Sequence, residues 1–330
     1  MYAEDFDFVV ENGRLYCGDY CIPIDGDEQT RQHLAHQAYL QLMDLELTTV
    51  PLENPRYILD IGTGGGEWAV AMAEKYEDCE VYGTDIAPIQ DTGVPKNVEY
   101  HIEDAEDEWI RPPDTFDLVH LRNMEGAFSN WSFIYNEAFA CIKPGGWIEV
   151  MDWEDFFAEN NYLSFFPDGS APHVLVKAVL EAAEVAGKPR DGRHLNRDLL
   201  VDAGFVDIQE SVYDVGIGSR ENSSYGTLWL LAILHGFEPN CLRLLTKYLR
   251  WDAEDVRELC SEVARATKEV AQDPDRVVPF VAKLRVVTGK KPMVPGQWTA
   301  MKLNENGDVN EYSGGESTIG ARTVHSEDTA

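Results

Sequence analysis

The chain has 330 residues, of which 44% are hydrophobic and 26% charged, a balance typical of a globular protein with a large core and not of a disordered chain. Asp and Glu number 59 against 27 Lys and Arg, which gives a formal net charge of −32. Such an excess of negative charge repels phosphate backbones and anionic lipid surfaces, and so argues against nucleic-acid and membrane partners.

Three further features concern cellular location and redox state. The longest purely apolar stretch, 228–234, is far shorter than the ~20 residues of a membrane-spanning helix. The acidic start MYAEDFDF does not resemble a signal peptide, so we expect a cytoplasmic protein, with the nucleus as the alternative. The six cysteines should then stay reduced. Cys17 and Cys21 lack a second ligand pair at zinc spacing, and we expect no metal.

The chain opens with a predicted hairpin and helix. Within 8–16, the pair Asn12-Gly13 separates two apolar runs, which is typical of a tight hairpin with a type I′ turn. Over 27–47 the apolar side chains cluster on one side of a 3.6-residue wheel, which predicts an amphipathic helix that ends before Pro51.

Short β-rich runs then alternate with helical stretches, a pattern that favours an α/β fold with a doubly wound parallel sheet. Strands are predicted at 56–61, 79–84, 97–102, 115–121, 146–151 and 205–213. Helices are predicted near 66–76, 129–142, 172–186 and 194–203. Two or three helices, broken at Pro239, are expected next, followed by a last strand over 278–288.

These elements suggest three parts. Residues 1–50 form the hairpin and a lid helix. A cofactor-binding domain follows over 51–296, with a helical cap around 153–203 and 221–272. The stretch 297–330 is rich in Asn, Gly, Ser, Thr and Glu, and is predicted to be a disordered tail.

The first strand of the sheet runs into a glycine loop with the spacing Asp60-x-Gly62-x-Gly64-x-Gly66, and a helix follows at once. Such loops let backbone amides approach a cofactor at the carboxyl end of the sheet. A dinucleotide site would have Gly in the position of Glu67, and two carboxylates here would repel a pyrophosphate. They suit S-adenosylmethionine (SAM), whose ammonium and sulfonium groups are cationic. Asp60 is predicted to help to hold its amino-acid end.

Two more carboxylates follow the next two strands. Asp85, with Ile86 beside it, ends the second strand, where a carboxylate can accept both ribose hydroxyls. Asp104, followed by Ala105, ends the third and can accept from the adenine amino group. Each piece alone has a plainer interpretation as a turn or a helix cap. Together, the three acids predict a site for one nucleoside.

As a set, these motifs resemble the class I SAM-dependent methyltransferases and, in detail, the LaeA-like group of filamentous fungi. The segments that carry the resemblance are 57–68, 81–90, 116–126, Trp131 and 143–152, with the acidic run 27–31 and His36 on the N-terminal helix. The resemblance covers about 27–292 and departs at Gly65 and Glu67. It implies a mostly parallel, Rossmann-like sheet of seven strands in which 278–288 runs antiparallel.

The fourth strand should end beneath the cofactor. Leu121 and Arg122 are expected to line its methionine part, and the residues from Asn123 to Glu125 to face the methyl acceptor. For Arg122, pairing with an acid for structure alone is the alternative. His120 lies inside the strand and is expected to pack in the core.

Methyl transfer needs a base only if the nucleophile starts protonated. His36 on the lid helix and Glu125 are the candidate catalytic groups, with a structural hydrogen bond and a solvated loop carboxylate as their alternatives. Trp68 is expected to anchor the helix on the sheet. Aromatic side chains near the acceptor side are mostly expected in the core, although some could line a pocket for a flat or lipophilic acceptor. They are Phe128, Trp131, Trp153, Phe156, Phe157, Tyr162, Phe165, Phe166 and Trp229.

Three hypotheses for function result. The leading one is a SAM-dependent methyltransferase acting on the O or N atom of a small-molecule acceptor, a fungal secondary metabolite. The second is a LaeA-like nuclear regulator that binds SAM and protein partners. The third is a cyclase with a methyltransferase fold that uses SAM as a bound charge only. The converging acids also predict that the site favours cationic SAM over its demethylated product, less so as salt rises.

Overall fold

The computed structural model describes residues 7–153, 162–218, 225–293, 302–303 and 309–310. The chain divides into two compact units, 1–292 and 293–330. In the second, the description covers only β10 (Lys302–Leu303) and β11 (Val309–Asn310), which pair antiparallel. The rest of the predicted disordered tail lies outside the described residues, as do Phe156 and Phe157.

The predicted N-terminal hairpin is present. It consists of β1 (Phe8–Glu11) and β2 (Arg14–Cys17), which pair antiparallel. Asn12 and Gly13 at its tip both have positive φ, 49° and 77°. Two left-handed residues in a two-residue loop are the mark of a type I′ turn, which matches the twist of the flanking strands.

A sheet of seven strands forms the centre of the first unit, in the order β5-β4-β3-β6-β7-β9-β8. Its strands are β3 (Tyr57–Ile61), β4 (Glu80–Asp85), β5 (Val98–Ile102), β6 (Phe116–Arg122), β7 (Ile142–Trp153), β8 (Val206–Gly216) and β9 (Val281–Lys290). β9 runs antiparallel to its neighbours β7 and β8, and the other strand pairs of this sheet are parallel. The predicted fold is confirmed, including the antiparallel last strand.

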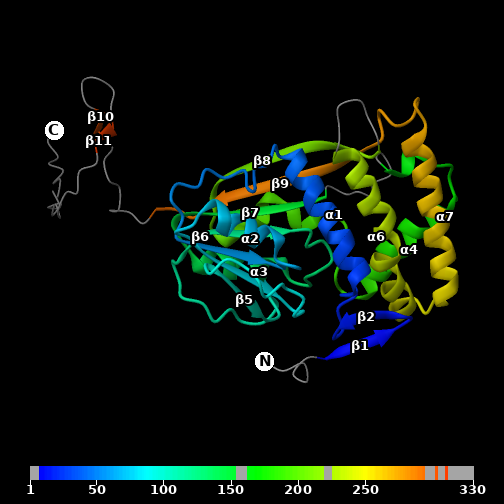
Figure 1. The fold of residues 1–330 in the computed structure, drawn as a ribbon, viewed down its shortest axis with the longest axis horizontal. Helices are drawn as coiled ribbons and strands as arrows, with labels where there is room; N and C mark the ends of the chain where they lie inside the picture. The colour runs from blue at the N-terminus through cyan, green and yellow to red at the C-terminus, as the bar shows by residue number, and fades with distance from the viewer. Residues whose placement is uncertain (1–6, 154–161, 219–224, 294–301, 304–308, 311–330) are drawn as a thin grey trace, which may run out of the picture. The chain divides into compact units, whose positions relative to one another are not determined.

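Helices cover both faces of this sheet (Figure 1). One face carries α2 (Glu67–Lys75), and the other carries α3 (Trp131–Cys141) and α5 (Arg197–Ala203), which follows a short 3-10 turn, η3 (Arg193–Leu195). Trp68 anchors α2, as predicted, because its ring is 2% exposed and its Nε1 donates to the carbonyl of Leu47 at 2.7 Å. His120 is fully buried and stacks on Trp68 at 3.9 Å. Both are therefore core residues.

The remaining helices form a layer beside the sheet (Figure 1). They are α4 (Ala171–Val185), α6 (Tyr225–Tyr248) and α7 (Ala253–Gln272), with the short turn η2 (Tyr162–Phe165). Their buried side chains share one core with those of α1 (Gly26–Leu42). Among the described residues, none of the helices combines the length and the apolar character that crossing a membrane requires.

Two helix boundaries differ from the prediction. The first helix ends at Leu42 and not near Leu47, because Asp44 and Leu45 adopt positive φ (51° and 68°). The sequence has no glycine at this turn that would have indicated it. The expected break at Pro239 is wrong, since α6 runs through it. Proline removes backbone hydrogen bonds from a helix. Here the side chain of Asn240 donates to the carbonyl of Gly236 at 2.8 Å, and packing on both sides holds the helix.

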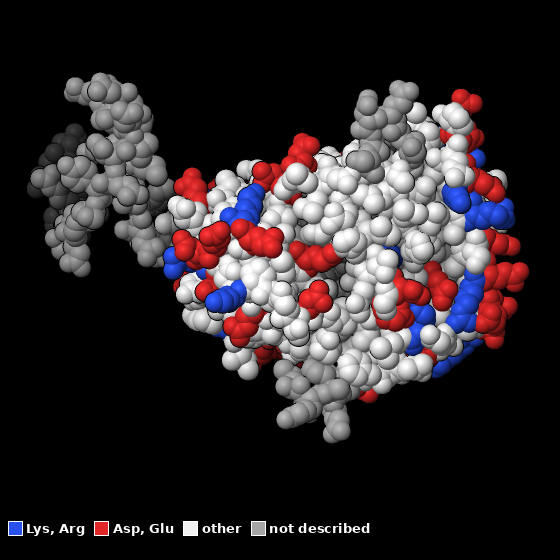
Figure 2. Space-filling view, viewed as in Figure 1, with Lys and Arg blue, Asp and Glu red and all other residues white. Residues whose placement is uncertain are grey.

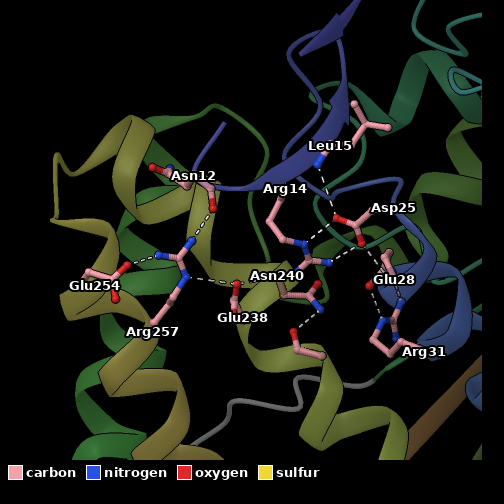
Figure 3. Close-up of polar contacts among 11 residues, drawn as sticks. Asn12, Arg14, Leu15, Asp25, Glu28, Arg31, Glu238, Asn240, Glu254 and Arg257 are labelled. Carbon is pink, nitrogen blue, oxygen red and sulfur yellow. Dashed lines mark hydrogen bonds and ion pairs between the residues drawn. The ribbon is translucent and has the colours of Figure 1, made fainter. Parts of the chain in front are cut away.

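Ion pairs fasten the hairpin and α1 to the helical layer (Figure 3). Arg14 of the hairpin makes a two-pronged contact with Asp25, at 2.6 and 2.7 Å, and Asp25 also caps α1. Glu238 of α6 lies 3.8 Å from Arg14 and 3.5 Å from Arg257 of α7. The N-terminal segment is therefore held in place over the sheet edge that carries the glycine loop.

Candidate active site

A cavity of about 910 Å³ opens where the carboxyl ends of β3, β4, β5 and β6 face α1 and the helical layer. Its volume lies at the upper end of the range for small-molecule sites, which leaves room for a cofactor and a second ligand. The lining includes eight of the ten predicted cofactor-binding residues and both predicted catalytic residues. These are Asp60, Gly62, Gly64, Asp85, Ile86, Asp104, Ala105 and Arg122, with His36 and Glu125.

Gly66 and Leu121 are outside this lining, and their contact with the cofactor stays a prediction. Neighbouring residues of a strand point to opposite faces, so Leu121 lies fully buried in the core of the α3 face while Arg122 reaches the cavity. Gly66 stands before α2 with φ +87°, and a Cβ there would come within 2.0 Å of the Tyr100 hydroxyl. Its role in the structure is close packing of helix on strand.

The glycine loop is fixed by the carboxylate that follows β4. Asp85 accepts hydrogen bonds from the backbone N–H of Gly64 at 2.8 Å and of Ala87 at 3.0 Å. The side chain of Gln90 donates to the carbonyls of Gly64 and Ala87. Burial raises the pKa of Asp85 to about 6, although the two backbone donors lower it. Loop and carboxylate thus form one hydrogen-bonded unit with polar atoms toward the cavity.

The two other acids are in different surroundings. Asp60 lies near the end of β3, next to the glycine loop, and is 4% exposed. It accepts a hydrogen bond from the Thr63 hydroxyl at 2.7 Å. Burial raises its pKa above the ordinary value. Asp104 is exposed and accepts from the backbone N–H of Glu106 at 2.9 Å. The three strand-end acids therefore line one cavity, as the sequence predicts, with Asp104 at its open edge.

His36 and Arg122 are hydrogen-bonded neighbours in the cavity lining. Arg122 donates to Nδ1 of His36 at 3.1 Å, and its guanidinium lies 4.8 Å from the centre of the Tyr39 ring. Burial, and after it the charge of Arg122, lowers the pKa of His36 to about 3. A neutral His36 can accept from Arg122, but it is a weak base for a substrate. The geometry favours a positioning role for His36. The alternative for Arg122, pairing with an acid, finds no partner among the described residues.

Aromatic rings line the end of the cavity below the helical layer. Trp153 and Trp229 stack with their centres 4.0 Å apart, and Tyr39 lies 5.8 Å from the first. The hydroxyl of Tyr39 and Nε1 of Trp153 both donate to the side-chain oxygen of Asn123. Nε1 of Trp229 is buried and has no hydrogen-bond partner within the part of the chain that the structure describes. This end suits a flat, largely apolar ligand.

Several lining residues were not singled out from the sequence, and three of them are charged groups with defined surroundings. Asp152, at the end of β7, accepts from the backbone N–H of Glu125 at 2.7 Å and from His194 at 3.1 Å, and so holds the loop after β6. Glu28 has a fully buried side chain that binds Arg31 through two contacts at 2.8 and 2.7 Å. Arg190 comes from the segment between α4 and η3. The pair of Glu28 and Arg31 could have been found from the sequence, because the two residues are three positions apart on one helix. Asp152 and Arg190 have partners far away in the sequence, which no local pattern indicates.

Fold, glycine loop and strand-end acids define a methyltransferase of the class I type. Residues 32–206 match the family model described as a methyltransferase domain, and the chain belongs to this family. It is 32% identical to the secondary metabolism regulator LAE1 of Cochliobolus heterostrophus over 79% of this chain and 92% of that protein. It is 28% identical to the methyltransferase pytC of Aspergillus terreus over 86% of this chain and 87% of that protein.

A third relative is the protein-methionine methyltransferase laeA of Emericella nidulans. The identity is 31% over 79% of this chain and 72% of that protein. The chain is thus similar over most of its length to LaeA-like proteins of fungi, and the relatives named here include one regulator and two methyltransferases.

Proposed function

We propose that the protein binds SAM at the glycine loop and transfers its methyl group to an O or N atom of a small fungal metabolite at the aromatic end of the cavity. The observation that supports this most is the continuity of one cavity from Asp85 and the glycine loop to the stacked Trp153 and Trp229. A site that only sensed SAM would need no second, aromatic compartment beside the cofactor.

The residues present fit the cofactor. Asp85 keeps unused lone pairs for the two ribose hydroxyls, and Asp60 offers a carboxylate to the ammonium group. Gly62 and Gly64 have positive φ and let the backbone approach closely. When bound, SAM would supply a methyl group on a cationic sulfur, which a nucleophile displaces in line.

The chain's own part in the reaction is positioning and exclusion of water. The aromatic rings and the helical layer would keep solvent from the reacting atoms, while Asn123 and Glu125 lie where the acceptor should be. Because His36 is a weak base, a nucleophile that ionises readily, or one with a free lone pair, fits this site best. Glu125 remains the candidate for accepting a proton where one must leave.

The test is incubation of the purified full chain with methyl-labelled SAM and metabolites made by enzymes encoded beside its gene. We expect label in the small-molecule fraction and none with an Asp85→Ala control. Label in a partner protein instead would favour the regulator hypothesis. A product formed without gain of a methyl group would favour the cyclase hypothesis, and SAM binding without any conversion would contradict the proposal.

The affinity for SAM should depend on pH through Asp85. Its pKa is about 6 in the folded chain, so the carboxyl is ionised and accepts from ribose above that pH and becomes protonated below it. We expect the Kd for SAM to rise as the pH falls from 7 to 5. His36, with a pKa of about 3, does not titrate in this interval. Titration calorimetry at several pH values checks this, and an affinity that is constant from pH 7 to 5 would contradict it.

A further inference from the structure

Arg190 is a buried cation of the cavity lining that the proposed reaction does not use. Arg190 is 9% exposed. The side chain fills the space beside Gly126, where a Cβ would come within 2.7 Å of the Arg190 Nε. It donates to the backbone carbonyl of Asn240 in α6 at 3.3 Å; Asn240 is labelled in Figure 3. Arg190 therefore connects the loop after β6 with the helical layer.

No carboxylate among the described residues pairs with Arg190, although acids outnumber bases by more than two to one in this chain. Acidic side chains also predominate on the face shown in Figure 2. Two other cations of the same cavity have acid partners, since Arg31 lies 2.7 Å from Glu28 and Lys188 lies 2.6 Å from Glu106, whereas Arg122 donates to His36. The structure gives the guanidinium of Arg190 one described hydrogen bond, so four of its five N–H groups are available to a ligand in the cavity that Arg190 lines.

Arg190 and Arg122 are held by different parts of the cavity wall. Arg122 ends β6, which pairs directly with the strand that leads into the glycine loop, so Arg122 is the cation beside the expected methionine group. Arg190 instead contacts Gly126 and α6, on the side of the cavity closed by the helical layer. An anion held by Arg190 would thus lie between α6 and the loop after β6, whose Glu125 is expected to face the acceptor.

We propose that Arg190 binds an oxyanion of the methyl acceptor, which makes the acceptor an aromatic or lipophilic acid. This inference rests on the proposed function. A guanidinium matches a carboxylate with two parallel hydrogen bonds, and the stacked Trp153 and Trp229 offer an apolar surface to the rest of the molecule. In a chain with net charge −32, a buried arginine also offsets the general repulsion of an anionic ligand.

The test uses planar aryl carboxylates as probes, each compared with its own primary amide. Binding is measured by ligand-observed NMR on the full chain saturated with S-adenosylhomocysteine (SAH). We expect the wild type to prefer the carboxylates by about tenfold or more, as a charge-assisted hydrogen-bond pair would provide. Arg190→Gln should remove this preference, and Arg190→Lys, which keeps the charge but not the planar fork, should retain part of it.

Two controls separate this proposal from its alternatives. Lys188→Gln removes a cation of the same cavity that already has an acid partner, and it should leave the preference intact. Without ligand, Arg190→Gln should melt at or above the wild-type temperature, because it removes a charge that has no acid partner among the described residues.

Equal binding of acids and amides by the wild type, or an unchanged preference in Arg190→Gln, would overturn the proposal. A loss of SAH affinity in Arg190→Gln would assign the residue to the cofactor, and a lowered melting temperature would make it structural. Failure of the wild type to bind SAH at all would refute the proposed function itself, a distinct result.

Discussion

Asp85→Ala should weaken SAM binding by roughly a hundredfold or more, since it removes two ribose hydrogen bonds to a charged acceptor, each contributing about 1.5–3 kcal/mol. The same carboxylate holds the backbone N–H groups of Gly64 and Ala87, so its loss also releases the glycine loop. Asp85→Asn should weaken SAM binding similarly, because the amide nitrogen of Asn cannot accept a hydrogen bond from a backbone N–H.

Titration calorimetry with SAM measures this effect. Asp91→Ala is the matched control, since Asp91 is an exposed acid on the loop that follows β4 and does not line the cavity. Its affinity should equal that of the wild type. If Asp85→Ala kept its affinity, the ribose would have to be held elsewhere and the account of the site would be wrong.

Gly62→Ala should be strongly unfavourable, whereas Gly65→Ala, in the same loop, should be nearly neutral. Gly62 has φ +70°, and a Cβ there would approach the sulfur of Met124 to 2.3 Å. Gly65 has no such φ, and nothing lies within 4 Å of its added Cβ. We expect Gly62→Ala to lower the free energy of unfolding by about 1–3 kcal/mol and to reduce SAM affinity. We expect Gly65→Ala to stay within about 0.5 kcal/mol of the wild type.

Chemical denaturation of both variants, followed by SAM titration, tests this pair. The comparison also addresses the departure of Gly65 from the pattern of the related methyltransferases. Since the space beside Gly65 is open, a side chain there would be tolerated, and its absence does not alter the loop. Equal stability of the two variants would show that the conformation of Gly62 is not required.

Features with a local physical cause could be predicted from the sequence. Asn12-Gly13 specifies its turn because both residues tolerate positive φ. The glycine loop and Asp85 could be predicted together because parallel strands bring their carboxyl ends to one edge of a sheet. The antiparallel direction of the last strand could be predicted only from the family resemblance, because no local pattern in 281–290 distinguishes a parallel from an antiparallel strand.

Features that depend on distant contacts could not be predicted. Pro239 normally ends a helix, and only the packing of α6 and the side chain of Asn240 keep it continuous. The cavity residues Asp152 and Arg190 acquire their surroundings from loops and helices far away in sequence. Leu121 packs in the core while Arg122 lines the cavity, because side chains alternate between the two faces along β6. The division of the first unit into a lid, a core domain and a cap stays a prediction.

A crystal structure of the full chain with SAH would test the central claim most directly, namely that three strand-end acids and the glycine loop hold one nucleoside. We expect both ribose hydroxyls within hydrogen-bond distance of Asp85, the adenine beside Asp104 and Ala105, and the amino-acid end near Asp60 and Arg122. A nucleoside bound away from Asp85, or a cavity that stays empty at saturating SAH, would contradict it.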